Sequence, residues 1–193
     1  MKKTLTLALA GLVSAILTTS ALADPPQPKI VVLDRGALLQ LSKAGQDIAR
    51  QMQAYSAQAK NDLAARGKAL QEEGRNLQQQ VAILAPDLKA KKVAAFQAKE
   101  QALQGEVQKK DEQMRAAFAQ ARAAMEQKLG PILQQLVKER GANLVLDKQA
   151  VVYATQNGFD ITGDAINQLN QQMPSLKVNF NVTPPAAPAA PKK

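Results

Sequence analysis

The feature that most constrains this fold is a long segment, from Ala37 to Ala85, that contains no proline and is rich in helix-forming residues. Alanine, glutamine, leucine, lysine, arginine and glutamate dominate it, and all of them favour helical backbone. Four leucines within it recur at seven-residue intervals: Leu63, Leu70, Leu77 and Leu84. A seven-residue repeat places a narrow apolar stripe along one helix face. The segment therefore predicts one long helix that packs against another helix in a coiled coil.

A turn is predicted at Ala85-Pro86-Asp87, because proline disfavours helical geometry in the residue before it and fits the first position of a new helix. A second apolar stripe follows, with three- and four-residue spacing, through Phe96, Leu103, Val107, Met114, Phe118, Ala121, Met125, Leu129, Ile132 and Leu136. Since the link is short, the helices are predicted to run antiparallel, as an arm over residues 37–140 with its tip near residues 85–87. Each helix would extend for roughly 70 Å at 1.5 Å per residue.

The two ends of the chain carry β-strand patterns. Residues 29–34 are short, apolar and β-branched, and residues 143–147 and 151–154 repeat this character after Gly141. Gly141 stands where a helix C-terminal glycine is expected. Because the arm folds back on itself, these strands are predicted to meet in a small base.

The rest of the base is predicted to contain a helix that Thr162 caps and Pro174 ends. Residues 176–182 alternate apolar and polar like a short edge strand, and the Pro/Ala tail, residues 183–193, is expected to be disordered. Residues 24–36 and 141–182 thus form the base. The predicted fold class is α+β: a long antiparallel coiled-coil hairpin that projects from a small β-sheet base with a C-terminal helix.

A base of only about 60 residues is marginal for independent stability. Its predicted strands are also apolar on both faces. Association of subunits would bury the surplus apolar surface. The number of subunits stays open on these grounds. The residues predicted to form this oligomerisation surface are Ile30, Val31, Val32, Leu33, Leu144, Val145, Leu146, Val151 and Val152.

The first 23 residues have the pattern of a secretory signal peptide. Lys2 and Lys3 precede an apolar run, and small residues follow up to Ala23, after which cleavage is predicted. The apolar run is too short for a permanent membrane anchor. We expect export across the inner membrane and a soluble mature chain in the periplasm.

The composition argues against catalysis. The chain has no histidine and no cysteine, so it lacks the usual acid/base group at neutral pH and the common ligands of zinc and iron. It also lacks a phosphate-binding glycine-rich loop followed by lysine. We predict no enzymatic activity, no catalytic residue, no metal site and no cofactor.

The charge indicates acidic partners. The net charge of +9 becomes +9 − 2 = +7 when Lys2 and Lys3 are removed with the signal peptide. In the cell envelope such a charge favours acidic polypeptides and anionic lipid surfaces. Nucleic acid is not expected, because export separates the chain from it and the arm lacks interleaved aromatic residues.

Both ends of the chain resemble the Skp/OmpH family of periplasmic chaperones. Residues 30–40, IVVLDRGALLQ, are similar to the family's first strand and helix start. Residues 142–147, 150–153 and 160–162 are similar to its closing pattern at the same spacings. The sequence departs from the pattern in a longer tail beyond Pro174.

This resemblance implies a jellyfish-like homotrimer with a small β-barrel-like body and three arms around a cavity. It also implies that unfolded outer-membrane proteins are held there without ATP, which prevents their aggregation before membrane insertion. The alternative from another class is a structural coiled-coil adaptor of the envelope, which would present defined interface patches to its partners.

Two groups in the arm are candidate sites for clients. A basic group is proposed to attract acidic unfolded chains: Lys89, Lys91, Lys92, Lys99, Lys109, Lys110 and Arg115. An apolar group surrounds the tip: Val81, Ile83, Leu84, Pro86 and Leu88. The alternatives are a solvated coiled-coil face for the first group and simple closure of the hairpin end for the second.

The seam itself is predicted to be weak. Arg66, Glu73 and Gln80 interrupt it. Three glycines add to this, Gly67, Gly74 and Gly105, and each costs about 0.5–1 kcal/mol relative to alanine in a helix. Our hypothesis is that the arm flexes to fit clients of different size, against the alternative of sequence drift in a tolerant coiled coil.

Overall fold

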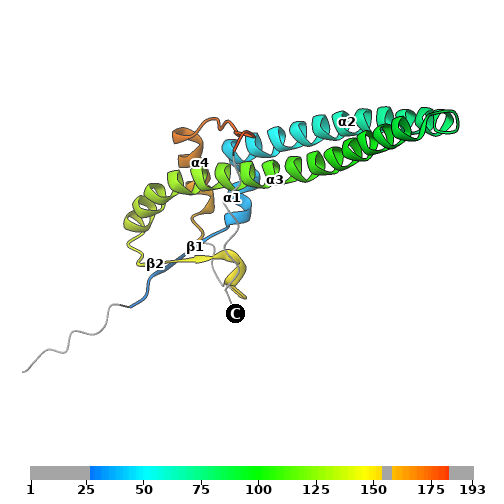
Figure 1. Cartoon of the computed structure of the whole chain (residues 1–193). Helices are drawn as coiled ribbons and strands as arrows, with labels where there is room; N and C mark the ends of the chain where they lie inside the picture. The colour runs from blue at the N-terminus through cyan, green and yellow to red at the C-terminus, as the bar shows by residue number, and fades with distance from the viewer. Residues whose placement is uncertain (1–26, 154–157, 183–193) are drawn as a thin grey trace, which may run out of the picture.

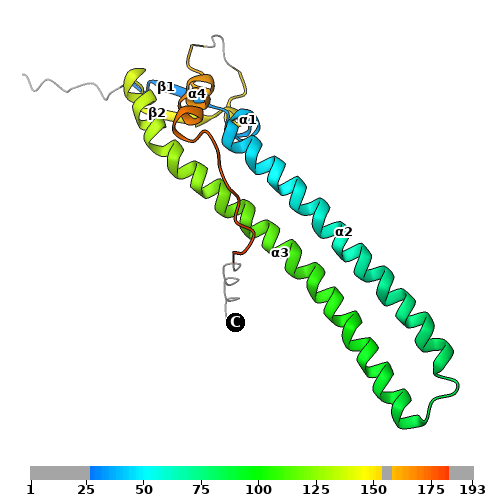
Figure 2. The ribbon, with the colours of Figure 1, turned by 90° about the horizontal axis from the view of Figure 1, so that it is seen from above.

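The computed structural model describes residues 27–153 and 158–182. Two long helices run side by side and stand out from a small base, as Figure 1 and Figure 2 show from two directions. The fold is thus mostly helical with one small sheet. The predicted signal peptide, residues 1–23, and the predicted tail, residues 183–193, lie outside the described residues.

The first predicted helix is broken near its start. Helix α1 spans Arg35–Leu41 and helix α2 spans Lys43–Gln80, with Ser42 in extended geometry between them at ψ 150°. The Ser42 hydroxyl accepts a hydrogen bond from the Gly45 backbone N–H at 3.1 Å and so caps α2. The prediction of one unbroken helix from Ala37 is wrong because this buried serine ends one helix and starts the next.

Helix α3 spans Pro86–Glu139 and begins at the predicted proline. It runs antiparallel to α2, and residues 81–85 connect the two (Figure 2). The 38 residues of α2 and the 54 residues of α3 correspond to roughly 57 and 81 Å of helix at 1.5 Å per residue. After α3, Gly141 has a φ of 57°, which is the left-handed geometry expected of a glycine at a helix end.

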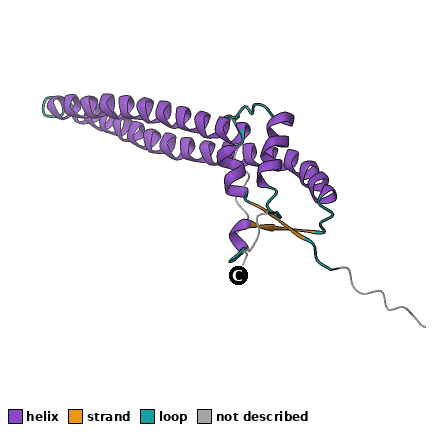
Figure 3. Cartoon of the chain, turned by 180° about the vertical axis from the view of Figure 1, so that it is seen from behind, coloured by secondary structure: helices purple, strands orange, loops and turns teal. Residues whose placement is uncertain are grey.

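The sheet consists of two parallel strands, β1 (Ile30–Leu33) and β2 (Leu144–Asp147), drawn in orange in Figure 3. Ile30 stands opposite Leu144, so the entire arm is the connection between the two strands. On the other edge of β1, the Val32 N–H donates to the Phe159 carbonyl at 2.8 Å. Strand β1 is therefore covered on both edges by its own chain.

Two further predicted strands are not found in the described residues. After β2 the Asp147 carboxylate accepts the Gln149 N–H at 3.0 Å, and the chain turns into a short 3₁₀ helix, η1 (Lys148–Ala150). This turn carries residues 151–153 away from the sheet; residue 154 lies outside the described part. Residues 176–182 are extended but pair with no strand.

Helix α4 spans Thr162–Gln172. The prediction that Thr162 is the N-cap is wrong, because Thr162 is already the first residue of the helix. The Thr162 hydroxyl accepts the Asp34 N–H at 2.8 Å, which ties α4 to the junction of β1 and α1. The N-cap position is Ile161, and the Asp160 carboxylate accepts the Thr162 N–H at 2.9 Å, which satisfies one backbone donor in the first turn.

One apolar core fills the base, where α1, α4 and β1 meet the roots of α2 and α3. Its most deeply buried large side chains are Leu38, Ile48, Ile132, Ile161 and Leu169. Burial of such a side chain contributes about 1.5–3 kcal/mol. The core therefore fixes the directions in which both arm helices leave the base.

Candidate functional site

The distal arm, residues 60–116, contains no fully buried side chain. Its seam leucines, such as Leu70 and Leu103, are only half-buried, because each faces one partner helix and solvent beyond it. The distal arm thus exposes most of its surface, and its two helices are joined by contacts that are individually weak.

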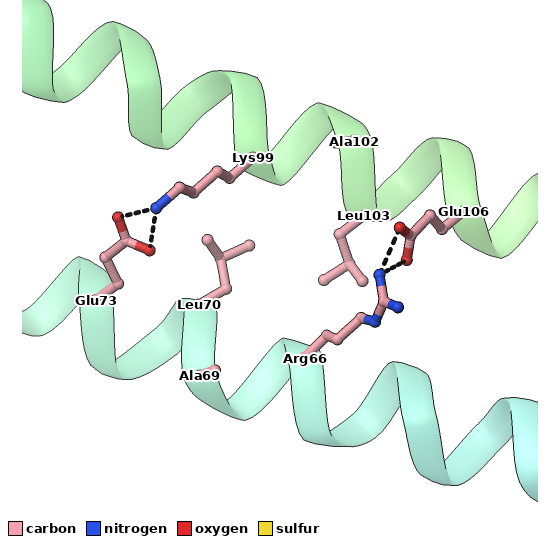
Figure 4. Close-up of a pocket in the computed structure, with 8 residues that line it drawn as sticks. All are labelled: Arg66, Ala69, Leu70, Glu73, Lys99, Ala102, Leu103 and Glu106. Carbon is pink, nitrogen blue, oxygen red and sulfur yellow. Dashed lines mark hydrogen bonds and ion pairs between the residues drawn. The ribbon is translucent and has the colours of Figure 1, made fainter.

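Two cross-helix ion pairs flank the seam in the distal arm (Figure 4). Arg66 Nη1 lies 2.5 Å from Glu106 Oε1, and Lys99 Nζ lies 2.6 Å from Glu73 Oε1. Figure 4 shows Leu70 between the pairs, in a shallow pocket of about 310 Å³. Because all four charged side chains are well exposed, each pair contributes only about 0.2–1 kcal/mol. The residues that interrupt the seam therefore link the helices instead of separating them.

The proposed basic group is divided by these contacts. Lys99 is bound to Glu73, and Lys110 Nζ lies over the Tyr55 ring, 5.3 Å from its centre. Lys92 donates to Gln80 Oε1 at 2.8 Å. Four members form no ion pair or side-chain hydrogen bond within the described residues: Lys89, Lys91, Lys109 and Arg115. Lys89, Lys91 and Lys92 lie close together in sequence near the tip.

The apolar group at the tip is divided as well. Ile83 is 86% exposed and Leu88 is 46% exposed, whereas Val81 and Leu84 are half-buried between the helices. Pro86 begins α3 and so shapes the turn. The structure places Val81 and Leu84 where they close the hairpin, and leaves Ile83 and Leu88 open to solvent.

The three arm glycines are not equivalent. A Cβ atom added at Gly74 would lie 2.9 Å from Phe96 Cζ, so Gly74 makes room for this ring between the helices. A Cβ added at Gly67 or Gly105 would meet nothing within 4 Å. The flexing hypothesis therefore concerns Gly67 and Gly105, while Gly74 has a packing reason that the sequence did not reveal.

The predicted oligomerisation surface contains both buried and exposed residues. Val31, Val32 and Leu33 are buried inside the chain, and Val145, Leu146 and Val151 are half-buried. The argument that both faces of the first strand await a partner is wrong for Val31, Val32 and Leu33, because these side chains are already buried within the chain itself. Large apolar side chains that remain exposed on the base are Ile30, Leu41, Leu144, Val152 and Tyr153.

Charged contacts join the elements of the base. Hydrogen bonds from Arg122 and from Arg35 lower the pKa of the Glu126 carboxyl, and the bond from Arg35 links α1 to α3. Burial raises the pKa of Asp160, but the hydrogen bonds from Thr162 and Lys148 outweigh it, so the net pKa is lowered. Asp160 thus stays ionised where residues 159–161 meet β1 and α4.

Sequence reasoning missed a set of contacts at the root of the arm. Asp47 and Gln51 of α2 hydrogen-bond to the backbone of residues 176–178, and Tyr55 stacks on Phe180. The four-residue spacing of these three side chains was the available signal.

Two classes of site receive no support from the described ranges, 27–153 and 158–182. No cluster of acidic side chains there is arranged to hold a metal ion. Among the helices of those ranges, none combines the length and the apolar character that a membrane crossing needs.

Comparison with known proteins gives one family. The sequence profile of a family described as outer membrane protein (OmpH-like) matches residues 29–169, which is more than half of the chain. No curated protein sequence matches. A crystal structure from Caulobacter crescentus, assigned as an outer membrane chaperone (OmpH-like), superposes with a TM-score of 0.72 at 22% identity and covers 80% of this chain and 91% of its own. This likeness supports the fold.

Proposed function

The chain belongs to the OmpH-like outer membrane protein family, and from this membership and the geometry of the arm we propose that it is an ATP-independent holding chaperone of the periplasm. Its clients are unfolded outer-membrane proteins, which it keeps from aggregating before they insert into the membrane. The predicted signal peptide and the absence of histidine and cysteine from the sequence agree with this role.

The observation that carries the proposal is the distal arm. The two helices project tens of ångströms from the core, and their distal part buries no side chain fully. This part therefore adds little to the stability of the fold, but it offers a long surface to another chain. Many weak contacts along such a surface hold a client through multiplicity, without a rigid pocket.

The cavity requires more than one arm. We propose a homotrimer in which the exposed apolar residues of the base, such as Ile30, Leu144 and Val152, meet between subunits. Burial of this surface would stabilise the assembly. Three arms would then stand around a shared space, as the family resemblance implies.

Charge would bring clients to the arms. Lys89, Lys91 and Lys92 lie near the tip, where Asp87 is the only acidic residue between residues 76 and 98. Exposed charges of this kind act over roughly 8–10 Å at ordinary ionic strength, so capture should weaken as salt is added. Reversal of all three to glutamate tests this: unaltered affinity and salt dependence would remove them from the mechanism.

The proposal is tested by the mass of the purified protein with and without an unfolded outer-membrane barrel protein, together with suppression of that protein's aggregation. A trimer that binds one or more clients and keeps them soluble is expected. A structural adaptor would instead leave unrelated denatured barrel proteins to aggregate, and that result would overturn the proposal.

A further inference from the structure

The last described segment, residues 174–182, packs on the root of the arm and not on the sheet. It follows α4 and runs along the arm in extended form (Figure 2). Leu176, Val178 and Phe180 are buried or half-buried, while the residues between them are exposed. This alternation is typical of a strand with one covered face, although the covering element is a helix.

Side chains of α2 take the place of a neighbouring strand. The Leu176 N–H donates to Asp47 Oδ2 at 3.0 Å. Gln51 uses both ends of its amide, since its Nε2 donates to the Leu176 carbonyl at 2.7 Å and its Oε1 accepts the Val178 N–H at 3.0 Å. These three bonds reach only backbone atoms, so any sequence with the same extended backbone can form them.

Tyr55 adds a contact for an aromatic side chain. The Phe180 ring stacks on Tyr55 with 4.1 Å between ring centres and 1° between the ring planes. The Tyr55 hydroxyl donates to Gln113 Oε1 of α3 at 3.0 Å, and Lys110 lies over the ring. Contacts from α3 thus hold Tyr55 in position independently of the segment that stacks on it.

The spacing of these groups matches an extended chain. Asp47, Gln51 and Tyr55 are four residues apart on one face of α2, and four residues of helix advance about 6 Å. Two residues of extended chain advance about 6.6 Å. A four-residue stripe on the helix therefore stays in step with alternate residues of the segment, from Leu176 to Phe180.

We propose that Asp47, Gln51 and Tyr55 form a binding site for extended segments with alternating apolar residues, in which strands of unfolded outer-membrane barrel proteins exchange with the chain's own C-terminal segment. Transmembrane barrel strands carry this alternation and are flanked by aromatic residues. The identity of the client rests on the function proposed above, whereas the site rests on the contacts just described.

The tethered segment sets how firmly a client can bind. A segment joined to its site by a short linker acts at an effective concentration in the millimolar range, roughly. A client strand displaces it only when the client is concentrated beside the arm. The tethered segment therefore lowers the apparent affinity of a client for this site, which suits a chaperone that must release its client without ATP.

The site is tested first without a client, on the full chain lacking only its predicted signal peptide, with a fluorescent peptide of residues 174–182. Phe180→Ala removes the stack from the tethered segment and leaves the site intact. The peptide should bind about three- to tenfold more tightly to Phe180→Ala than to the wild type. Asn181→Ala, which alters an exposed side chain of the same segment, should match the wild type.

A peptide of the same composition with its apolar residues placed next to one another is the specificity control, and it should not bind. Equal binding of the two peptides, or no binding of either to Phe180→Ala, would overturn the site. Circular dichroism of the variants confirms that they are folded.

The client is tested by hydrogen exchange on the wild type. The Leu176 and Val178 amides should lose protection when an unfolded barrel protein saturates the chain, while the Val32 amide of the base stays protected. Unchanged protection of the two amides with the client bound would overturn the exchange and leave the chaperone function standing. Failure of the client to bind at all would refute the chaperone function, and the peptide result would still decide the site.

Discussion

The base and the distal arm of this protein are stabilised in different ways. In the base, side chains from separate elements pack into one core, in which Leu38, Ile132 and Leu169 are at most 1% exposed. In the distal arm no side chain is fully buried, and half-buried leucines and exposed ion pairs join the helices. The difference teaches that a packed core holds the base together, while many small contributions hold the two helices of the arm together.

The largest contrast is expected between core and seam truncations. Ile132→Ala leaves a cavity in the base and should lower the free energy of unfolding by about 2–5 kcal/mol. Leu70→Ala removes a half-buried side chain and should cost roughly 1 kcal/mol. Urea unfolding followed by circular dichroism measures both. Equal losses would mean that the distal arm is packed as firmly as the base.

The next effect concerns the break between α1 and α2. A Cβ atom added at Gly45 would lie 1.8 Å from the Leu39 carbonyl oxygen, so Gly45→Ala must move backbone and should destabilise the base by about 1–3 kcal/mol. Gly130→Ala is the matched control, because its Cβ would meet nothing within 4 Å and should stabilise α3 slightly. Thermal unfolding of the two variants should shift in opposite directions.

A smaller effect is expected from the arm glycines. Gly67→Ala and Gly105→Ala should each raise stability by about 0.5–1 kcal/mol, since alanine restricts the unfolded chain and fits the open space. Gly74→Ala should gain less or lose, because the Phe96 ring must move. Hydrogen exchange of arm amides reports these changes. If the double variant of Gly67 and Gly105 holds the same range of clients, the flexing hypothesis fails.

The smallest effect is on pH dependence in the base. The pKa of Asp160 is lower in the folded chain than its ordinary value of about 4, so its ionised form stabilises the fold above that pH. This contribution is lost as pH falls through the folded-state pKa. Asp160→Asn should therefore be less stable than the wild type at pH 7, and the gap should close below about pH 4. If the difference in stability between the variant and the wild type persisted in acid, the Asp160 side chain would act through its hydrogen-bond geometry and not through its charge.

The arm was predictable because its pattern is local. The seven-residue leucine repeat and Pro86 specify two antiparallel helices without reference to any distant residue, and Gly141 marks the end of the second helix. The break at Ser42 was accessible in principle, because serine is a preferred N-cap residue. Its burial against Met125 depends on tertiary packing that no local pattern encodes.

The base was predicted less well because its structure depends on contacts between residues that are distant in sequence. Residues 151–153 have strand-like composition, but the Asp147 side chain turns the chain away from the sheet before they begin. Residues 176–182 have strand-like alternation, yet side chains of α2 replace the partner strand. The alternation was a correct sign of a covered face and an incorrect sign of what covers it.

The parallel pairing of β1 with β2 has a consequence for the order of folding. Lys29 and Asn143 are hydrogen-bonded at 2.9 Å although 114 residues separate them. Closing a loop of that length carries an entropic cost, and contacts between distant residues form slowly. The turn at Pro86 involves only residues that are close in sequence. We therefore expect the helical hairpin to form first, starting at its tip, and to bring the two strands together. The sheet would then be the last part of the chain to assemble, after both helices of the arm have formed.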